Sequence, residues 1–388
     1  MKILIVNATL ATFTGTETYV RDLAIGLLRR GHTPVVYAPE LGEIARQMRL
    51  ATVPVVDDLN NVGVTPDVIH GNHNTELMSA LLHFPDVPAV FFCHSWTDWI
   101  SFPPTHPRIQ AYVAVDETCR DRLLYEHAIP EHKLCVSLNS VDLERFKPRA
   151  PLPEKLRRAL VFSNGANQWT HLPAVKEACA RAGLALDVVG AGENAETSNP
   201  ETVLGNYDLV FAKARCALEA MIVGTAVILC DARGCGPLVT TGELEKLRQQ
   251  NFGVRALTDP AGSDLLLREI ARYDANDASE VSRRLRLSSG LDTAIDDVLT
   301  VYTEAISGFR EGPKPDPVED ARAAAAYLRW LTLGTRQRQA SYESMLANSR
   351  ILRMRNALAK IPLIDWPLRR LGNLVHRNKD GAINNGRR

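Results

Sequence analysis

The sequence predicts an α/β fold made of two tandem doubly wound domains, followed by a helical, basic C-terminal tail. Three observations lead to this prediction. Short apolar runs rich in β-branched residues alternate with helical patterns from the first residue, a proline-rich stretch interrupts the alternation at residues 145–155, and the alternation then starts again. A chain of 388 residues is long for a single core, which also favours two domains.

The first half of the chain contains six runs with the length and composition of buried parallel strands. Between the first two runs, apolar residues recur at helical spacing, and the pattern stops at Gly31, a residue type that terminates helices. Strand, helix and strand joined by short connections predict right-handed crossovers in an open parallel sheet. The six runs are "KILIVN", "TPVVYA", "PDVIHGN", "AVFFCHS", "AYVAVD" and "KLCVSLNS".

The second half repeats this alternation with "ALVFSN", "ALDVVGAG", "YDLVFAKA", "TAVILCDARG" and "FGVRALT" as predicted strands. We therefore expect a first domain over residues 1–148 and a second over residues 156–310. The alanine-rich segment "VEDARAAAAYLRWL" follows acidic residues and prolines, which stand at its start as a helix N-terminus prefers. It predicts a helix over residues 315–335 that returns toward the first domain.

Composition narrows the class of protein and its compartment. The formal net charge is 0, so nothing in the total charge indicates a nucleic-acid partner, and seven cysteines scattered through apolar strands are typical of reduced thiols. The N-terminal "MKILIVNATL" is too short an apolar run for a signal peptide. No stretch reaches the roughly 18 consecutive apolar residues that span a bilayer. We expect a cytoplasmic protein.

The neutral total conceals a basic C-terminal segment. Residues 336–388 contain twelve lysines and arginines against three acidic residues. Apolar residues between Ile351 and Ile361 alternate with basic ones, and Trp366 lies within "PLIDWPL". This pattern predicts contact with an anionic membrane surface, which would make the protein peripheral on the inner face of the membrane. A helix packed back onto the domains, or an arm that binds a partner, remains the alternative.

Candidate site residues follow from the sheet itself, because ligands of open α/β sheets bind outside the carboxyl ends of the strands. After the first strand, Gly15, Thr16 and Glu17 open a helix whose free N–H groups suit an anion or a sugar hydroxyl. The Gly-x-Gly-x-x-Gly dinucleotide spacing is absent, and a plain capped turn is the alternative. His94 follows "AVFFC", where it can bind a substrate, act as a base or be structural.

In the second half, glycine pairs follow two predicted strands. Gly190 and Gly192 lie in "VVGAGEN", and Gly234 and Gly236 lie in "DARGCGP". Because glycine has no side chain, we expect both segments to be loops that a ligand can approach closely.

Three charged residues surround the start of the helix in "FAKARCALE". Lys213 and Arg215 follow a strand, and together with helix N-terminal amides they suit a diphosphate. Glu219 comes about one turn later, where a carboxylate can bind a ribose diol. Surface ion pairing is the alternative for each charge taken singly. His70 and His73 in "HGNHN" lack a carboxylate companion, so we expect no metal site there.

Over residues 1 to about 310, the sequence resembles the retaining, nucleotide-sugar-dependent glycosyltransferases of the GT-B architecture, in the large family 4-like group. The matching segments keep their order and spacing. In "SLNSVDLERFKP", which matches the family's Asn-Gly-Val-Asp…Phe-x-Pro run, Ser140 replaces glycine. The other segments are "TGTETYVRDLAIGLLRRGH", "PDVIHGNHN", "AVFFCHSW", "YVAVDETCRDRL", "LDVVGAG" and "ALEAMIVGTAVILCDARG".

The resemblance implies two Rossmann-like domains, with the acceptor bound by the first and the nucleotide-sugar donor by the second. It also implies that Gly15 and Thr16 face the donor phosphates and the acceptor, that His94 lines the acceptor and sugar side, and that Glu219 binds the nucleotide ribose. From the resemblance and the strand-end positions together, we expect the following roles. The expected catalytic residues are His94, Lys213 and Arg215; the expected donor-binding residues are Gly15, Thr16, Ser163, Asn164, Gly190, Gly192, Glu219, Gly234 and Gly236; the expected acceptor-binding residues are Glu17, His94 and Asn139.

Two departures from the family pattern concern the donor site. The family usually has a second glutamate eight positions before Glu219, where this chain has Phe211. It also usually has an arginine and a lysine after the first strand of the second domain, where this chain has no basic residue until Lys176. Because buried phosphate charge is costly without cations, we expect Lys213 and Arg215 to replace them.

These observations predict a metal-independent glycosyltransferase without a cofactor, since the nucleotide sugar is a substrate. The expected acceptor is a glycan or a lipid-linked saccharide in cell-surface polysaccharide synthesis. Two alternatives stay open: a catalytically degenerate GT-B protein that binds nucleotide, glycan or a partner without turnover, and a nucleotide-sugar epimerase of the same architecture.

Overall fold

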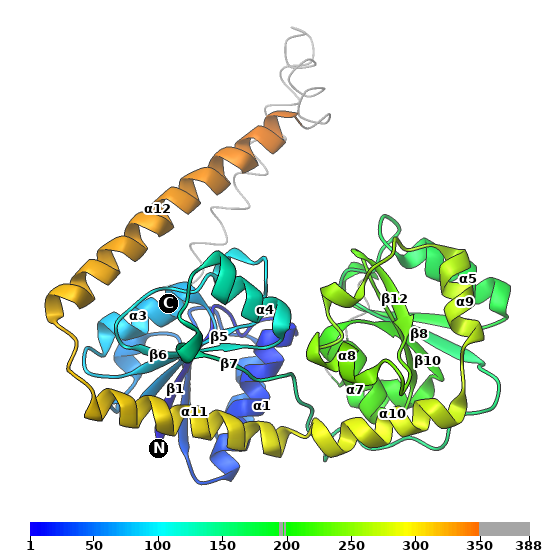
Figure 1. Cartoon of the computed structure of the whole chain (residues 1–388), viewed down its shortest axis with the longest axis horizontal. Helices are drawn as coiled ribbons and strands as arrows, with labels where there is room; N and C mark the ends of the chain where they lie inside the picture. The colour runs from blue at the N-terminus through cyan, green and yellow to red at the C-terminus, as the bar shows by residue number, and fades with distance from the viewer. Residues whose placement is uncertain (194–196, 198, 349–388) are drawn as a thin grey trace, which may run out of the picture. The chain divides into compact units, whose positions relative to one another are not determined.

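The computed structural model describes residues 1–193, 197 and 199–348 (Figure 1). The chain divides after Asp320 into two compact units. The first unit contains two β-sheets, each covered by helices. The second unit consists of the chain from Ala321 onward.

The first sheet has seven parallel strands in the order β3-β2-β1-β4-β5-β6-β7. The order reverses between β1 and β4, so the crevice at the carboxyl ends of these two strands is the expected ligand position. All six strands predicted for this half are confirmed, and only the two-residue β3 was not predicted. The strands are β1 (Lys2–Val6), β2 (Thr33–Tyr37), β3 (Val55–Val56), β4 (Val68–Gly71), β5 (Ala89–Cys93), β6 (Ile109–Ala114) and β7 (Leu134–Val136).

The predicted first helix is confirmed as α1 (Gly15–Arg29). Its periodic apolar residues, among them Val20, Leu23 and Leu27, are buried against the first sheet. The helix ends before Gly31, which has a φ of 78° and therefore adopts the left-handed conformation that glycine tolerates best. The other helices between the strands of this sheet are α2 (Glu43–Leu50), α3 (Asn74–His83) and α4 (Glu117–Asp121).

The second sheet has the order β12-β11-β10-β8-β9, with β12 antiparallel to β11 and the other strands parallel. Its strands are β8 (Arg158–Phe162), β9 (Ala185–Val189), β10 (Leu209–Ala212), β11 (Ala226–Asp231) and β12 (Gly234–Leu238). Its helices are α5 (Leu172–Ala182), α6 (Pro200–Val203), α7 (Ala214–Val223), α8 (Leu244–Gln249), α9 (Ser263–Ala271) and α10 (Ala275–Ser288).

The edge of the second sheet corrects two predictions. "FGVRALT" is not a strand, since only a short 3-10 turn forms at Val254–Ala256, and the segment with Gly234 and Gly236 is strand β12 rather than a loop. A Cβ at Gly236 would lie 2.3 Å from the carbonyl oxygen of Ala256, and one at Gly234 would lie 2.4 Å from that of Asp259. These glycines therefore allow close backbone packing at the sheet edge.

Helix α11 (Leu291–Glu311) brings the chain back to the first sheet (Figure 1). Its residues Ile295, Val298 and Tyr302 are buried in the same core as β1 and α1. The sequence pattern instead predicts that these residues belong to the second domain, over residues 156–310. It predicts that the chain returns to the first domain only with a helix over residues 315–335. The apolar stripe of an amphipathic helix does not say which sheet it covers, so sequence periodicity alone places this helix on neither domain.

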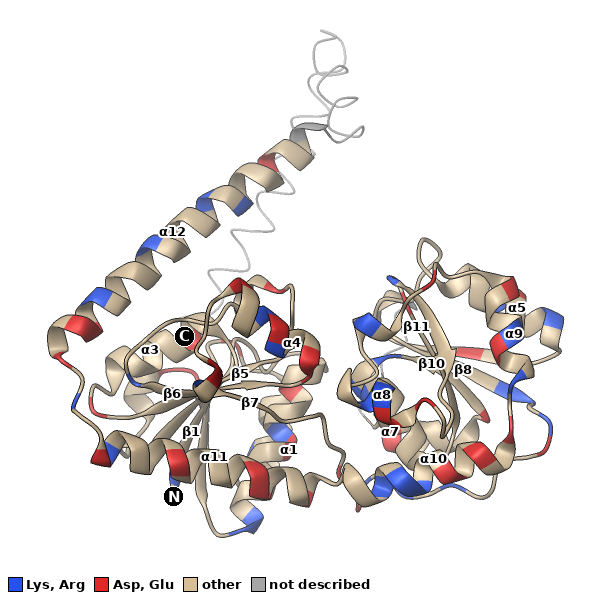
Figure 2. Cartoon of the chain, viewed as in Figure 1, with Lys and Arg blue, Asp and Glu red and all other residues tan. Residues whose placement is uncertain are grey.

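Helix α12 (Pro317–Asn348) contains the alanine-rich segment predicted to be helical. Of the basic tail expected over residues 336–388, Arg336 and Arg338 belong to this helix. Figure 2 shows the Lys and Arg positions along α12 in blue. The rest of the tail, including Ile351–Ile361 and Trp366, lies outside the described residues. Within the described part of the chain, no helix has the length and apolar character needed to span a bilayer.

Candidate functional site

Polar side chains meet at the carboxyl edge of the first sheet, where β4 and β5 end. His94 directly follows β5, and its Nε2 atom lies 2.8 Å from Oδ1 of Asn72, which directly follows β4. Nε2 of His70 lies 3.1 Å from the same oxygen. Nδ1 of His70 lies 2.7 Å from the hydroxyl group of Tyr302 in α11. His94 is therefore one end of a hydrogen-bonded chain that starts in α11.

The imidazoles of this chain are uncharged at neutral pH. Burial lowers the pKa of His70 to about 3. Burial also lowers the pKa of His94 well below its usual value, and the nearby His73, His70 and Arg215 lower it further. A neutral imidazole can accept a hydrogen bond or a proton from a hydroxyl group.

The start of α1 lies at the same sheet edge. Gly15 is exposed, with no atom within 4 Å of where its Cβ would be, and Thr16 is half-buried. Glu17 is buried and accepts hydrogen bonds from the hydroxyl groups of Thr12, at 3.2 Å, and Thr14. Burial raises the pKa of Glu17, and the hydrogen bonds only partly oppose this. Gly15 and Thr16 are thus accessible to a ligand, whereas Glu17 is engaged within its own loop.

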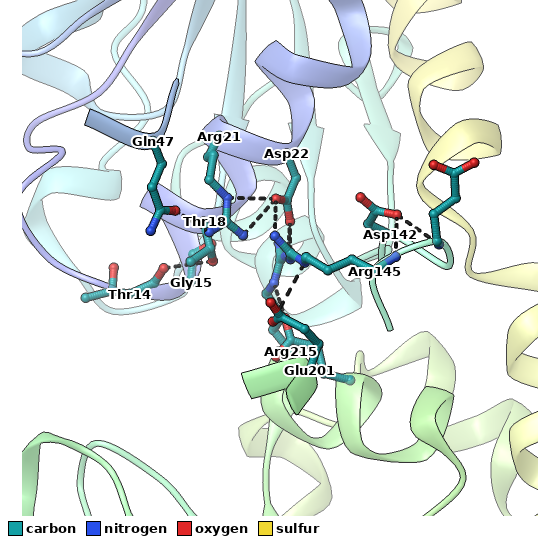
Figure 3. Close-up of polar contacts among 12 residues, drawn as sticks. Thr14, Gly15, Thr18, Arg21, Asp22, Gln47, Asp142, Arg145, Glu201 and Arg215 are labelled. Atoms are coloured by element: carbon teal, nitrogen blue, oxygen red, sulfur yellow. Dashed lines mark hydrogen bonds and ion pairs between the residues drawn. The ribbon is translucent and has the colours of Figure 1, made fainter. Parts of the chain in front are cut away.

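A cluster of five charged residues, here called the Asp22 cluster, connects α1 with α7. Figure 3 shows four of them: Arg21, Asp22, Arg145 and Arg215. The buried carboxylate of Asp22 accepts hydrogen bonds from Arg21 at 2.9 Å, from Arg145 at 3.2 Å and from Arg215. Nε of Arg215 also donates to Glu219 at 2.8 Å. Arg215 and Glu219 come from α7, so the cluster joins the two sheets of the first unit.

Charge pairing and burial act against each other in the Asp22 cluster. Burial favours the neutral acid of Asp22, but Arg215, Arg21 and Arg145 outweigh burial and leave its pKa lowered. Burial raises the pKa of Glu219, although Arg215 opposes this. Arg215 itself stays charged, because Asp22 and Glu219 raise its pKa more than burial lowers it. The carboxylate predicted to bind ribose is therefore an ion-pair partner of the predicted phosphate ligand.

Lys213 is engaged with a different carboxylate. Its Nζ atom pairs with Asp231, the last residue of β11. The hydroxyl group of Ser163, just after β8, lies 3.5 Å from Oδ1 of Asp231. His171 is buried nearby, and neither of its ring nitrogens has a hydrogen-bond partner in the structure. Burial lowers the pKa of His171, and Asp231 partly opposes this. These residues line the carboxyl edge of the second sheet.

The loops after β8 and β9 lie directly against each other. A Cβ at Gly190, which has a φ of 153°, would lie 2.1 Å from the carbonyl oxygen of Ser163. A Cβ at Gly192 would lie 2.1 Å from the carbonyl oxygen of Ala166, and Oδ1 of Asn164 accepts a hydrogen bond of 3.1 Å from the amide that follows Gly190. The structure therefore brings together the four donor-binding candidates Ser163, Asn164, Gly190 and Gly192.

Asn139 does not join the other acceptor-binding candidates in any described contact. Its carbonyl oxygen accepts a hydrogen bond of 2.7 Å from Arg248 of α8. It lies in the segment that leads to Val141, which forms an isolated bridge with Gly290. This position belongs to the crossing between the domains.

Comparisons with known proteins agree with this architecture. Residues 63–145 match the model of Glycosyltransferase Family 4. A glycosyltransferase from Rickettsia africae superposes with a TM-score of 0.59 at 14% identity, over 79% of this chain and 98% of that one. HepE from Anabaena, solved in complex with UDP and glucose, superposes with a TM-score of 0.59 at 16% identity, over 78% of this chain and 100% of that one. No curated protein sequence matches this chain.

A sucrose-phosphate synthase from Thermosynechococcus elongatus also superposes, with a TM-score of 0.57 at 12% identity, over 79% of this chain and 99% of that chain. The chain has the GT-B fold. The resemblance to family 4-like glycosyltransferases of this fold is confirmed. At identities this low, the superpositions show the fold.

Several residues of the candidate site, among them Asp231, Asn72 and Asp22, were not predicted from the sequence. Asp231 ends a buried strand and Asn72 follows one. Both could therefore have been found from the rule that ligands bind at the carboxyl ends of strands. Asp22 lies in the middle of a helix, and its partners Arg145 and Arg215 are more than a hundred positions away. No local pattern identifies such a residue.

Phe211, at the position where the resemblance to family 4-like glycosyltransferases implies a second glutamate, lies fully buried in β10. It packs in the core of the second domain. Among the residues that the structure describes, no group of three or more His, Cys, Asp or Glu side chains is arranged to hold a metal ion.

Proposed function

We propose that this protein is a glycosyltransferase that moves a sugar from a nucleotide-sugar donor, bound at the second sheet, to an acceptor bound at the first. The observation that carries this proposal is the position of Arg215. It begins α7 at the carboxyl edge of the second sheet, pairs with Asp22 of the first domain, and lies close enough to His94 to lower its pKa. The predicted donor and acceptor residues thus share one polar region.

In this proposal, Lys213 and Arg215 stabilise the diphosphate that leaves during transfer. Positive charge placed where negative charge develops commonly accounts for most of the acceleration in such reactions. In the structure, Lys213 is paired with Asp231 and Arg215 with Asp22 and Glu219. A diphosphate would replace carboxylates as the partner of these cations. Glu219, released from Arg215, would then accept hydrogen bonds from the ribose diol.

The acceptor in this proposal is a glycan or a lipid-linked saccharide of cell-surface polysaccharide synthesis. The neutral His94 accepts the hydrogen bond of the acceptor's reacting hydroxyl group, and the accessible Gly15 and Thr16 follow a strand of the same sheet. The protein needs no metal and no cofactor, because Lys213 and Arg215 supply the positive charge. The basic segment over residues 336–388 holds the enzyme, a cytoplasmic protein, at an anionic membrane surface.

One observation favours a second candidate, a degenerate GT-B protein that binds a nucleotide or glycan without turnover. Phe211 is fully buried and apolar where the family usually places a glutamate near the donor sugar. A donor site without this carboxylate retains the groups that bind the nucleotide but has one fewer polar group to bind the donor sugar.

A donor screen separates the two candidates. The melting temperature of the full-length protein is measured with UDP-, GDP-, ADP- and CMP-sugars, and each stabilising donor is then tested for sugar transfer and hydrolysis. We expect at least one donor to raise the melting temperature and to be consumed. Stabilisation without transfer or hydrolysis across the panel would establish a degenerate protein that binds nucleotide, and no stabilisation by any donor would refute the transferase.

Substitution of the two cations tests the site. Lys213→Met together with Arg215→Met is expected to lower kcat by at least about 100-fold, the typical loss when transition-state charge stabilisation is removed. Lys176→Met with Arg268→Met, two exposed cations on α5 and α9, is the matched control. A melting curve of each variant checks that it is folded. Turnover that survives in the folded Lys213/Arg215 variant would reject these residues.

Membrane binding is tested with the chain truncated after Thr335. The full-length protein is expected to sediment with liposomes that contain anionic lipid, less so at high salt, because exposed charges are screened. The truncated chain is expected to remain in the supernatant. Equal sedimentation of the two chains would contradict a membrane role for residues 336–388.

A further inference from the structure

The chain of hydrogen bonds behind His94 defines which of its nitrogens carries the proton. The side-chain amide nitrogen of Asn72 lies 3.1 Å from the carbonyl oxygen of Val6, an acceptor that requires an N–H donor. This contact orients the amide of Asn72, so its oxygen points toward the two imidazoles. An amide oxygen only accepts hydrogen bonds. Nε2 of His70 and Nε2 of His94 must therefore both carry a proton.

The contact between His70 and Tyr302, at the other end of these hydrogen bonds, agrees with this assignment. Since His70 is neutral and protonated at Nε2, its Nδ1 has a lone pair, which accepts the hydrogen bond of 2.7 Å from the Tyr302 hydroxyl group. Asn72, His70 and Tyr302 are each fully buried. Reversing one member would leave a buried donor facing a donor or a buried acceptor facing an acceptor, at the cost of an unsatisfied polar group. The four residues therefore select one arrangement of protons.

We propose that Asn72 is a positioning residue that holds His94 in the tautomer protonated at Nε2, so that Nδ1 remains a hydrogen-bond acceptor for the hydroxyl group of the sugar acceptor. The inference rests on the proposed function for the use of Nδ1, but the tautomer itself does not depend on turnover. A ring nitrogen is matched to its task by the hydrogen bond that the other nitrogen makes. Here that bond is the one between Nε2 of His94 and Oδ1 of Asn72, at 2.8 Å.

The first test observes the tautomer directly. Two-bond proton–nitrogen correlation spectra of the full-length protein, labelled with nitrogen-15 histidine, distinguish the two neutral tautomers and the imidazolium. The signals are assigned by their loss in His94→Gln and His70→Gln. We expect both imidazoles to show the Nε2-protonated pattern between pH 6 and 8. A His94 that is protonated at Nδ1, averaged between tautomers, or charged in this range would overturn the proposal.

Two substitutions separate positioning from packing. In Asn72→Leu, both imidazoles lose their acceptor, so we expect His94 to average between tautomers and kcat to fall at least tenfold with the donor KM within twofold. In Tyr302→Phe, only His70 loses its donor. We expect the His70 signals to change, while His94 stays protonated at Nε2, because its own contact with Asn72 is kept. An Asn72→Leu protein that is folded and keeps both the His94 tautomer and kcat would refute the proposal.

A third variant keeps the acceptor and adds a charge. Asn72→Asp still accepts from both imidazoles, so it should preserve the tautomer, yet its carboxylate should raise the pKa of His94. The groups that already face His94 are His70, His73, Arg215 and the ring of Tyr19, none of which is acidic. We therefore expect kcat to acquire a new decline toward low pH, where His94 becomes protonated. An unchanged pH profile of kcat would contradict the role of Nδ1.

The outcomes distinguish this inference from the proposed function. A protein whose His94 is protonated at Nε2 but which transfers no sugar retains the assigned tautomer and refutes its use in transfer. A protein that transfers sugar with His94 protonated at Nδ1 refutes the inference and leaves the transferase proposal intact.

Discussion

Asp22 is held by three arginines from three parts of the chain, and this concentration of charge sets the electrostatics of the candidate site. Its side chain is only 5% exposed to solvent. A buried charge is tolerated only when it is paired and hydrogen-bonded. Arg21, Arg145 and Arg215 satisfy this requirement, and the removal of the carboxylate would leave three cations close together.

Asp22→Asn is expected to lower the free energy of unfolding at pH 7 by about 3 kcal/mol, the typical cost of breaking a buried ion pair. The folded-state pKa of Asp22 is lowered. Its contribution to stability is therefore present above the unfolded pKa of about 3.9 and is lost as pH falls through the folded pKa. Urea unfolding of both proteins should show a difference that is constant near neutral pH and shrinks below about pH 4.

The matched control is Asp292→Asn, which removes a carboxylate that pairs with Arg30 but is 90% exposed. It should leave the free energy of unfolding nearly unchanged, because exposed ion pairs contribute little. If the Asp22→Asn difference were the same at all pH values, the lost stability would come from packing rather than from charge.

Individual site residues could be predicted only where a local sequence pattern indicates their position. Arg215 and Glu219 lie four positions apart, so the sequence placed both on one helix face, and the structure pairs them. Their mutual pairing was not predicted, because an isolated helix does not tell whether two charges face a ligand or each other. Asp22 was missed for a different reason, since its partner Arg215 is 193 positions away.

At the scale of elements, α11 is the helix that completes the first domain. It packs against α1, where Gly26 leaves room for it: a Cβ at this position would lie 2.1 Å from Cδ1 of Ile295. Glycine inside a helix is unfavourable by about 1 kcal/mol relative to alanine. Its presence in the middle of α1 is therefore explained by the close approach of the two helices.

Gly26→Ala is expected to destabilise the protein by about 1–3 kcal/mol through overpacking, in spite of the better helix propensity of alanine. Ile295→Val removes the clashing Cδ1 atom, so the double variant should regain part of this loss. Chemical unfolding of the single and double variants measures the coupling. Gly63→Ala, where nothing lies within 4 Å of the added Cβ, serves as the control. Additive effects of the two substitutions would contradict a direct contact.

The elements themselves were predicted better than their assignment to domains. Buried parallel strands are short apolar runs, and six of the seven strands of the first sheet were found from this property alone. The same property misassigned "FGVRALT", because an apolar run also fits a 3-10 turn packed under a sheet edge, as at Val254–Ala256. Strand β12 was missed because Gly234 and Gly236 resemble a ligand loop until the backbone that packs against them is known.

At the scale of the whole molecule, the first domain is discontinuous in sequence. Its sheet is complete at β7 (Leu134–Val136), but its core also requires Ile295, Val298 and Tyr302 of α11, after the entire second domain. The chain therefore connects the domains twice, once before β8 and once between α10 and α11. Two connections constrain how the domains can separate more than a single linker would.

Truncation tests this organisation. A chain that ends at residue 290 lacks α11 and should lose the cooperative unfolding of the first domain, with increased binding of a hydrophobic dye. A chain that ends at residue 348 retains α11 and should unfold like the full-length protein. Calorimetry of both chains provides the measurement. A first domain that unfolds cooperatively in the 290-residue chain would show that α11 is dispensable.

The late arrival of α11 has a consequence for biosynthesis. Between the end of β7 and the start of α11 the ribosome adds about 150 residues, which takes roughly 8 to 30 s at typical elongation rates. During that time the nascent first sheet has left the exit tunnel with the apolar surface that α11 will cover still exposed to water. The second domain can already fold. Synonymous codon changes that slow translation upstream of Leu291 should therefore increase chaperone dependence and reduce soluble yield, whereas slowing after α11 has left the exit tunnel should not.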